Sequence, residues 1–408
     1  MVNKMDVKHY IQENWKNTIR TSAQADNSFM KLPKPYTVPC AKTLFTNFFY
    51  WDTYFANLGL MLDGMEEQAK NNLDDMAFFI KALGFVPNAD HLITRTQPPL
   101  FTRGVYDYYM HTQDKQVIYT YVDMIRKEFS FFENDRMTEI GLNAYKNDET
   151  NRGKLWYYDE FNRRLGYTED EKRIEKFALT DHLLAIAESG WDFNPRFSVE
   201  GNRFASQEFA HLDLNCLLFD AEQKLAYMLS EIGEESEAAQ WRKKAQQRAE
   251  LINRYMLDPQ TGLYFDYNYK RNCLSKTLSA AAFYPYAFGI SKDDKGAKET
   301  LRRLALEYGI SACEYRGEDA TYFQWDYPSM WPSNMYFAYV AMKNLGLQDE
   351  AKWVKNAYMG TVKRVFARTG DLWEKYDAKL GDVSVTSEYD TPAMMGWTAG
   401  VYRYMQEN

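Results

Sequence analysis

The chain has little of several residue types and patterns that mark particular classes of protein. Its 408 residues include only four cysteines, 21 glycines and 12 prolines. The cysteines lack the CxxC or CxH spacing of a zinc site, and the few glycines and prolines exclude a collagen-like or linker-like chain. No stretch approaches the roughly 18 uninterrupted apolar residues of a membrane span, and residues 1–20 lack the apolar segment of a secretory signal. We therefore expect a soluble cytoplasmic protein with reduced cysteines, no membrane partner, and no metal or other cofactor.

Basic residues are also scarce, while aromatic residues are abundant. The chain has 49 Lys and Arg against 57 Asp and Glu, a formal net charge of −8, which argues against a nucleic-acid partner. Its 10 Trp, 31 Tyr and 25 Phe make up 16% of the residues. This content excludes a disordered chain and is sufficient for a large core. No pattern in the sequence indicates the oligomeric state.

Helical periodicity is the dominant pattern. Between Glu237 and Met256, apolar residues recur every three or four positions, which places them on one face of a helix. Similar patterns, separated by Gly or Pro, predict about a dozen helices, at 6–20, 53–63, 66–83, 104–112, 114–133, 174–188, 217–229, 237–256, 276–289, 294–307, 332–345, 351–365 and 393–406. A short alternating run at 263–269 predicts a strand.

About twelve helices of similar length predict an all-α fold, an (α/α)6 barrel in which six hairpins form a double-layer toroid. An armadillo-like solenoid is the alternative, but such solenoids carry a repeated sequence pattern that is absent here. No linker-like stretch divides the chain. We therefore expect a single catalytic domain over 1–408, with 1–35 as an N-terminal helical extension.

The connections between the helices contain the unusual residues. Five of them are rich in Trp, carboxylate or amide side chains, in the segments 48–52, 86–99, 188–193, 324–328 and 373–398. Aromatic rings pack on the apolar faces of sugars, and carboxylates and amides bind sugar hydroxyls. Any one such segment is more simply explained as core packing and helix capping. Five of them indicate a sugar-binding site on loops of a rigid scaffold.

Glycoside hydrolysis requires two carboxyl groups, one as acid and the other to activate water or attack the sugar. Asp192 lies between Trp191 and Phe193, and burial among apolar rings favours a protonated carboxyl. Glu374 is followed by Lys375, which favours an ionised one. With 57 carboxylates in the chain, composition alone does not select this pair.

The motif-bearing segments resemble those of the trehalase family of glycoside hydrolases, in the same order, across roughly residues 40–405. Tyr50-Trp51-Asp52-Thr53-Tyr54-Phe55 matches the family's YWDSYF, and Asn88 with Arg95-Thr96-Gln97-Pro98-Pro99 matches PNG…RSQPP. The segment from Glu188 to Phe193 matches ESGWDF, and the segment from Gln324 to Pro328 matches QWDxP. Glu374-Lys375-Tyr376-Asp377 with Glu388-Tyr389 matches EKYD…GEY, and the segment from Gly396 to Val401 matches GWTNGV.

The resemblance implies an (α/α)6 barrel that hydrolyses an α-glucosidic bond in a small sugar with inversion. It implies Asp192 as general acid and Glu374 as general base, and an inverting pair stands about 6.5–9.5 Å apart. The sugar-binding positions that it implies are Phe45, Trp51, Asp52, Asn88, Arg95, Gln97, Gly190, Trp325 and Glu388. Arg163 matches the arginine of the family's RPESY segment, with Tyr167 and Glu169-Asp170 as anchors of that alignment.

The chain departs from the family on the aglycone side, the side of the leaving group. Leu44 stands at the arginine of the family's GGRF, and Leu165 at the glutamate of RPESY. The glycine-rich run before GEY is missing, and residues 89–94 form a shorter loop. Leu supplies no hydrogen bond, so the subsite for the aglycone is altered, whereas the subsite for the cleaved glucose is intact.

The sequence leaves several functions open. Trehalose is the leading substrate, and the substrate's phosphorylation state is undetermined. Asn194-Pro195-Arg196 also resembles glycoside hydrolase family 63, whose members include enzymes acting on glucosylglycerate or mannosylglycerate. A lyase or epimerase would use a base such as His91, and a catalytically inactive sugar-binding relative would need the Trp pocket without both carboxylates.

Overall fold

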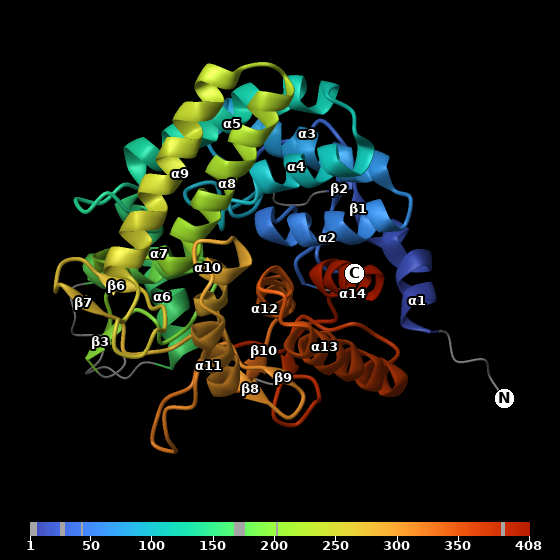
Figure 1. Ribbon diagram of the computed structural model, residues 1–408. Coiled ribbons are helices and arrows are strands. Elements are labelled where there is room, and N and C mark those ends of the chain that lie inside the picture. The colour runs from blue at the N-terminus through green and yellow to red at the C-terminus, as the bar shows by residue number, and fades with distance from the viewer. Residues whose placement is uncertain (1–5, 25–28, 42–43, 167–175, 201–202, 385–387) are drawn as a thin grey trace.

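The computed structural model describes residues 6–24, 29–41, 44–166, 176–200, 203–384 and 388–408 (Figure 1). Its helices are α1 (Val7–Asn14), α2 (Tyr50–Leu62), α3 (Glu66–Leu83), α4 (Phe101–Thr112), α5 (Gln116–Asp135), α6 (Asn151–Leu165), α7 (Lys176–Glu188), α8 (Leu212–Glu231), α9 (Glu235–Tyr255), α10 (Tyr284–Ala287), α11 (Asp294–Leu304), α12 (Pro332–Asn344), α13 (Gln348–Thr369) and α14 (Gly396–Glu407).

The strands are two or three residues long and pair antiparallel in small sheets between the helices. The pairings are β1 (Ile19–Arg20) with β2 (Tyr36–Thr37), β3 (Ser198–Glu200) with β4 (Arg203–Phe204), β8 (Ala305–Leu306) with β9 (Gly309–Ile310), β10 (Ser329–Met330) with β11 (Tyr376–Asp377), and β6 (Tyr267–Asn268) with both β5 (Phe209–Ala210) and β7 (Cys273–Leu274). These sheets position loops and do not form a separate layer.

Six helices form a closed inner ring. α2 packs against α4, α4 against α8, α8 against α10, α10 against α12, α12 against α14, and α14 returns to α2. The last contact is close because a Cβ on Gly400 would overlap the Phe55 carbonyl, and the Cα of Gly400 lies 3.0 Å from the position of a Cβ on Gly59. Contact between the first and last inner helices confirms the (α/α)6 barrel and rules out the open solenoid.

Apart from α6 and α7, the remaining helices alternate with the inner ones along the chain and cover them. α3, α5, α9, α11 and α13 pack outside the ring, and α1 lies against α13 and α14 through the Tyr10–Phe366 ring contact and the Lys8–Glu407 ion pair. Burial follows from this arrangement. Inner α2 buries all but one of its residues, whereas outer α9 buries one stripe that includes Ala238, Trp241 and Ala245.

Two differences from the predicted elements matter for the site. Residues 151–165 form α6, which the sequence did not predict because this polar segment leaves Leu155 and Trp156 exposed. α6 packs on α7, and the two share a second core cluster with Phe193. The predicted helix 276–289 is instead a 3-10 turn at 280–283 followed by the single turn of α10, and the predicted strand 263–269 is reduced to β6.

Candidate active site

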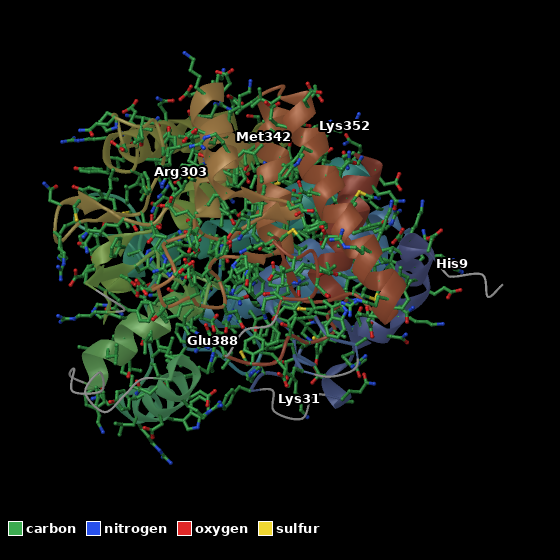
Figure 2. All side chains as sticks on the ribbon, turned by 90° about the horizontal axis from the view of Figure 1, so that it is seen from below. His9, Lys31, Arg303, Met342, Lys352 and Glu388 are labelled. Atoms are coloured by element: carbon green, nitrogen blue, oxygen red, sulfur yellow. The ribbon has the colours of Figure 1, made fainter. Side chains whose placement is uncertain are left out.

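Every residue that the sequence predicts for the site lines one cavity of about 700 Å³. The residues come from the loops between helices, from the first turn of α2 and, for Arg163, from the last turn of α6. In Figure 2 Glu388 lies between the C-terminal segments and the α6–α7 pair. The predicted residues in its lining are Phe45, Trp51, Asp52, Asn88, Arg95, Gln97, Arg163, Gly190, Asp192, Trp325, Glu374 and Glu388. Segments more than 300 residues apart in the chain therefore meet at one place.

Tryptophans form the floor of the cavity. Trp325 stacks on Trp331 with ring centroids 3.7 Å apart and on Trp191 at 5.0 Å. Trp51 lies 5.5 Å from Trp325, and Trp397 meets Trp51 edge to face at 5.6 Å. Trp331 is a site residue that sequence reasoning missed, although its position shortly after Trp325 in a loop leading to α12 was a usable signal. The stack provides a rigid apolar surface for a sugar ring.

Gly190 allows the chain to pass close to the tryptophan floor of the cavity. Its φ is +75°, a left-handed conformation that favours glycine. A Cβ at this position would lie 2.9 Å from Cζ2 of Trp51. Glycine is therefore required here both by conformation and by space, and it positions the following Asp192.

A polar surface adjoins the tryptophans. The Gln97 side chain accepts a hydrogen bond from the backbone amide of Trp51 at 3.2 Å. The backbone amide of Asn88 donates a hydrogen bond to the Arg95 carbonyl at 2.8 Å. Arg95 donates to the Tyr157 hydroxyl at 3.1 Å and lies over the Tyr157 ring. We call Trp51, Asp52, Asn88, Gln97 and Trp325, all of them buried, the inner wall.

Asp192 is held by an arginine that the sequence analysis did not select. Arg164 Nη1 donates to Asp192 Oδ2 at 2.8 Å, and its Nη2 donates to Glu388 Oε2 at 3.0 Å. The guanidinium also lies 4.7 Å from the centre of the Phe193 ring. Arg164 thus joins two carboxyl groups of the cavity.

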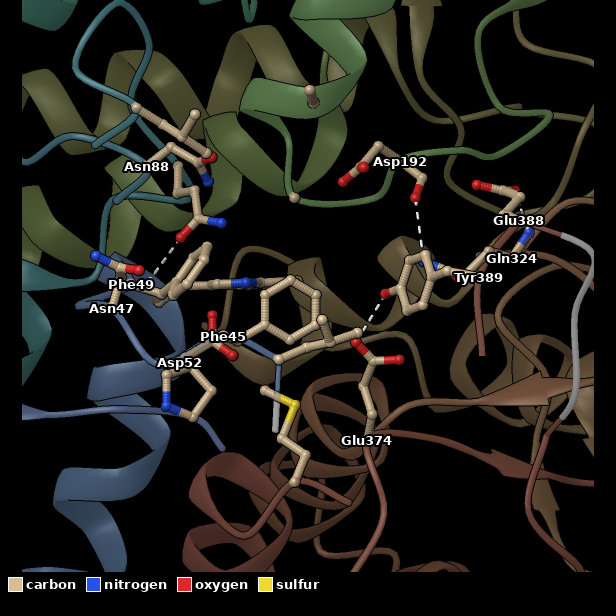
Figure 3. Close-up of a pocket in the computed structure, with 18 of the residues that line it drawn as sticks. Phe45, Asn47, Phe49, Asp52, Asn88, Asp192, Gln324, Glu374, Glu388 and Tyr389 are labelled. Atoms are coloured by element: carbon tan, nitrogen blue, oxygen red, sulfur yellow. Dashed lines mark hydrogen bonds between the residues drawn. The ribbon is translucent and has the colours of Figure 1, made fainter. Parts of the chain in front are cut away.

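Glu374 is held by two donors. Lys375 Nζ donates to its Oε2 at 2.8 Å, and the Tyr389 hydroxyl donates to its Oε1 at 2.7 Å. The indole of Trp397 donates to the Glu374 carbonyl at 3.0 Å. Figure 3 shows Glu374 and Asp192 on opposite sides of the cavity.

Two further carboxyls bind protons more tightly than usual. Burial, followed by the neighbouring charge of Glu374, raises the pKa of Asp52 to about 8. Burial raises the pKa of Glu388 to about 7, against the lowering effect of Arg164. At neutral pH, Asp52 therefore holds its proton and can donate as well as accept hydrogen bonds.

The opposite edge of the cavity is open to solvent. Leu44 is 54% exposed, and the Arg163 side chain is 69% exposed and pairs with Glu160 at 2.7 Å. His91 lies 3.2 Å from the buried Asp90 carboxylate. We call Leu44, His91, Leu92, Glu160 and Arg163, all of which line the cavity, the outer rim.

The RPESY-like segment is placed differently from the sequence alignment. Arg163 lies on the outer rim, and Arg164 is the arginine that reaches Asp192. Leu165 packs against the second core cluster. The expected anchors Tyr167, Glu169 and Asp170 lie outside the described residues.

Two other kinds of feature are absent from the described ranges. No group of three or more His, Cys, Asp or Glu side chains in them could hold a metal ion. No helix in the same ranges is long and apolar enough to cross a membrane.

Comparisons with known proteins show relatives over nearly the whole chain. A periplasmic trehalase of Xanthomonas campestris pv. campestris (strain 8004) is 28% identical over 97% of this chain and 72% of its own length. Neutral trehalase Nth1 of Saccharomyces cerevisiae has a TM-score of 0.74 at 20% identity, over 98% of this chain and 79% of that chain. The family 63 mannosylglycerate hydrolase of Thermus thermophilus, solved with glucose, has a TM-score of 0.66 at 14% identity, over 98% of this chain and 100% of that chain.

The expected cytoplasmic location is wrong in view of these relatives. Proteins of two Xanthomonas strains that match 97% of this chain are named periplasmic. The expectation depended on the polar character of residues 1–20 and on unpaired cysteines. A cellular address is read by a receptor from a short segment outside the fold, so the composition of the folded part does not report it.

The family assignment follows from a match over nearly the whole chain. A family model described as trehalase matches residues 2–408. The motifs that resemble this family in the sequence lie around one cavity, on the barrel that the trehalase and family 63 structures share. The chain belongs to the trehalase family of glycoside hydrolases.

Proposed function

We propose that the protein hydrolyses the α-glucosidic bond of trehalose or a related short α-glucoside with inversion, with Asp192 as general acid and Glu374 as general base. The observation that carries this proposal is the placement of the two carboxyls on opposite sides of a cavity whose floor consists of tryptophans (Figure 3). Inverting hydrolysis needs acid and base on opposite faces of the sugar, with room for a water molecule.

In this mechanism, Asp192 gives its proton to the bridging oxygen as the bond from C1 to that oxygen breaks. Glu374 takes a proton from a water molecule whose oxygen attacks C1 from the opposite face. Arg164, 2.8 Å from Asp192, stabilises the carboxylate that remains after proton transfer. The proton on Glu374 then passes to solvent and Asp192 takes up a proton from solvent, which restores both the base and the acid.

The inner wall fits the glucose that is cleaved. Its stacked tryptophans contact the apolar face of a ring, and Asp52, Asn88 and Gln97 supply polar groups for hydroxyls. These groups are buried, so a substrate that lacked the matching hydroxyls would leave them unpaired. The proposal therefore assigns glucose recognition to the inner wall.

In this proposal the outer rim binds the aglycone, and its residues also suit a second candidate substrate. The mannosylglycerate hydrolase likeness covers this whole barrel, and Arg163 gives the rim an exposed cation that suits a carboxylate-bearing aglycone. A glucoside or mannoside of glycerate is therefore the alternative substrate. A periplasmic location, as in the names of the Xanthomonas relatives, accompanies either version.

A panel of α-linked substrates tests the proposal. We expect glucose release from trehalose, and a higher kcat/KM on glucosylglycerate or mannosylglycerate would favour the alternative. Asp192→Asn and Glu374→Gln should each lower kcat by about 10²- to 10⁴-fold, because each removes a proton-transfer group. Thermal unfolding of both variants should stay close to that of the parent protein. Substantial turnover in either variant would remove that residue from its proposed role.

A further inference from the structure

We propose that Tyr389 is a positioning residue that orients the Glu374 carboxylate, and that the Glu388-Tyr389 pair fixes the base relative to the acid. The inference rests on the roles of Asp192 and Glu374 proposed above. It gives Tyr389 a function in the reaction without contact with the reacting atoms.

The first support is the contact of Tyr389 with the base. Its hydroxyl donates to Glu374 Oε1 at 2.7 Å (Figure 3). Burial and the charge of Glu374 raise the pKa of the Tyr389 phenol well above its ordinary value. The phenol therefore keeps its proton at working pH and remains a donor.

The second support is the use of both Glu374 oxygens. Lys375 Nζ holds Oε2 at 2.8 Å and is itself anchored by Gln324 Oε1 at 3.3 Å. With one donor on each oxygen, the plane of the carboxylate is fixed. Each oxygen keeps a second lone pair for a water molecule, so the clamp orients the base without blocking it.

The third support is the neighbouring residue in the chain. Glu388 accepts from Arg164 at 3.0 Å, and Arg164 holds Asp192 at 2.8 Å. The Glu388 Oε1 atom accepts a hydrogen bond from the backbone amide of Gln324 at 2.8 Å, which holds Glu388 in place against the 324–328 loop. Two consecutive residues thus connect to the acid through Arg164 and to the base directly.

The Tyr389 ring has contacts that a phenylalanine would keep. It lies 6.1 Å from the Phe45 ring, 4.7 Å from Lys375 Nζ and 5.7 Å from the Arg164 guanidinium. Tyr389→Phe therefore removes the hydroxyl while retaining the packing. Among the described residues, Lys375 and Asp52 are then the charged or titratable groups that interact with Glu374.

The test compares Tyr389→Phe with the parent enzyme on trehalose and on α-glucosyl fluoride, whose fluoride leaves without proton donation by an acid. We expect kcat to fall about 10- to 100-fold on both substrates, the size of effect that follows misplacement of a reacting group, with KM within about threefold. The acidic limb of the pH profile should move to higher pH, because a donor that favours the ionised base is lost.

Tyr121→Phe is the matched control, since the buried Tyr121 hydroxyl donates to Asp74 at 2.6 Å and neither residue lines the cavity. It should leave kcat and the pH profile unchanged. An unchanged kcat and acidic limb in Tyr389→Phe, a loss confined to trehalose, or a change in KM alone would each overturn the inference. If Glu374→Gln stays active, the proposed function itself fails. If Glu374→Gln is inactive and Tyr389→Phe is normal, only this inference fails.

Discussion

The inner wall and the outer rim of the cavity differ in how firmly their residues are held. On the inner wall, Trp51 is fixed by Gln97 and by the tryptophan stack, and Asp52 is buried in the first turn of α2. On the outer rim, Leu44 and Arg163 are largely in solvent. A rigid buried surface can select one sugar by its hydroxyls, whereas an exposed edge discriminates weakly.

This difference matches the way the motifs resemble the family. The inner-wall residues agree with the family segments, while Leu44 on the outer rim departs from them. Under the proposed function, glucose recognition and aglycone choice are therefore separable properties of the two regions. Matched changes in each region test that separation.

The largest expected difference is between two consecutive arginines. Arg164→Met should lower kcat/KM about 10- to 100-fold, because the side chain holds both Asp192 and Glu388 in a partly buried site. Arg163→Met should change kcat/KM on trehalose by less than about threefold, because its pair with Glu160 is exposed. Steady-state kinetics measure both. Equal losses would show that the rim is as important for turnover as the interior.

A smaller effect is expected from glycines of matched backbone conformation. Gly190 and Gly64 both have φ of +75°, but only Gly190 has Trp51 where a Cβ would be. Gly64→Ala should cost about 1–2 kcal/mol of unfolding free energy from conformation alone, and Gly190→Ala should cost more and lower kcat. Denaturant unfolding and kinetics check this, and equal stability costs with intact activity would contradict the close approach at Trp51.

The last expected effect is a pH dependence of stability from Asp52. Its pKa rises from 3.8 to about 8 on folding, so between these values the folded state binds a proton that the unfolded state releases. Stability is then full below about pH 4 and is lost as pH rises to about 8, by at most about 1.4 kcal/mol per pH unit. Asp52→Asn removes this loss.

We therefore expect the unfolding free energy of Asp52→Asn, relative to the parent protein, to increase from about pH 5 to about pH 8. Comparing the two proteins cancels the contributions of other buried carboxyls such as Glu128 and Asp75, whose pKa values burial also raises. Chemical denaturation at both pH values measures the difference. A difference that does not change with pH would place Asp52 in a more polar environment than the buried inner wall.

Apolar periodicity predicted the barrel and the resemblance to the trehalase family implied the inner-wall residues, but no such pattern predicted α6. Regular apolar spacing marks helices such as α9, and Trp beside carboxylate marks the site loops. In α6, exposed Leu155 and Trp156 break the amphipathic pattern. No helical periodicity in the sequence therefore indicated which of Arg163 and Arg164 points toward Asp192. Tyr389 lay within a recognised motif, but its bond to Glu374 depends on a contact between two loops.

The stereochemistry of hydrolysis tests the central claim most directly. α-Glucosyl fluoride makes the test independent of the aglycone, and proton NMR can record the first glucose formed before the anomers equilibrate. Inversion by Asp192 and Glu374 predicts that β-glucose appears first. Initial formation of α-glucose would contradict the assignment of Glu374 as a base that activates water.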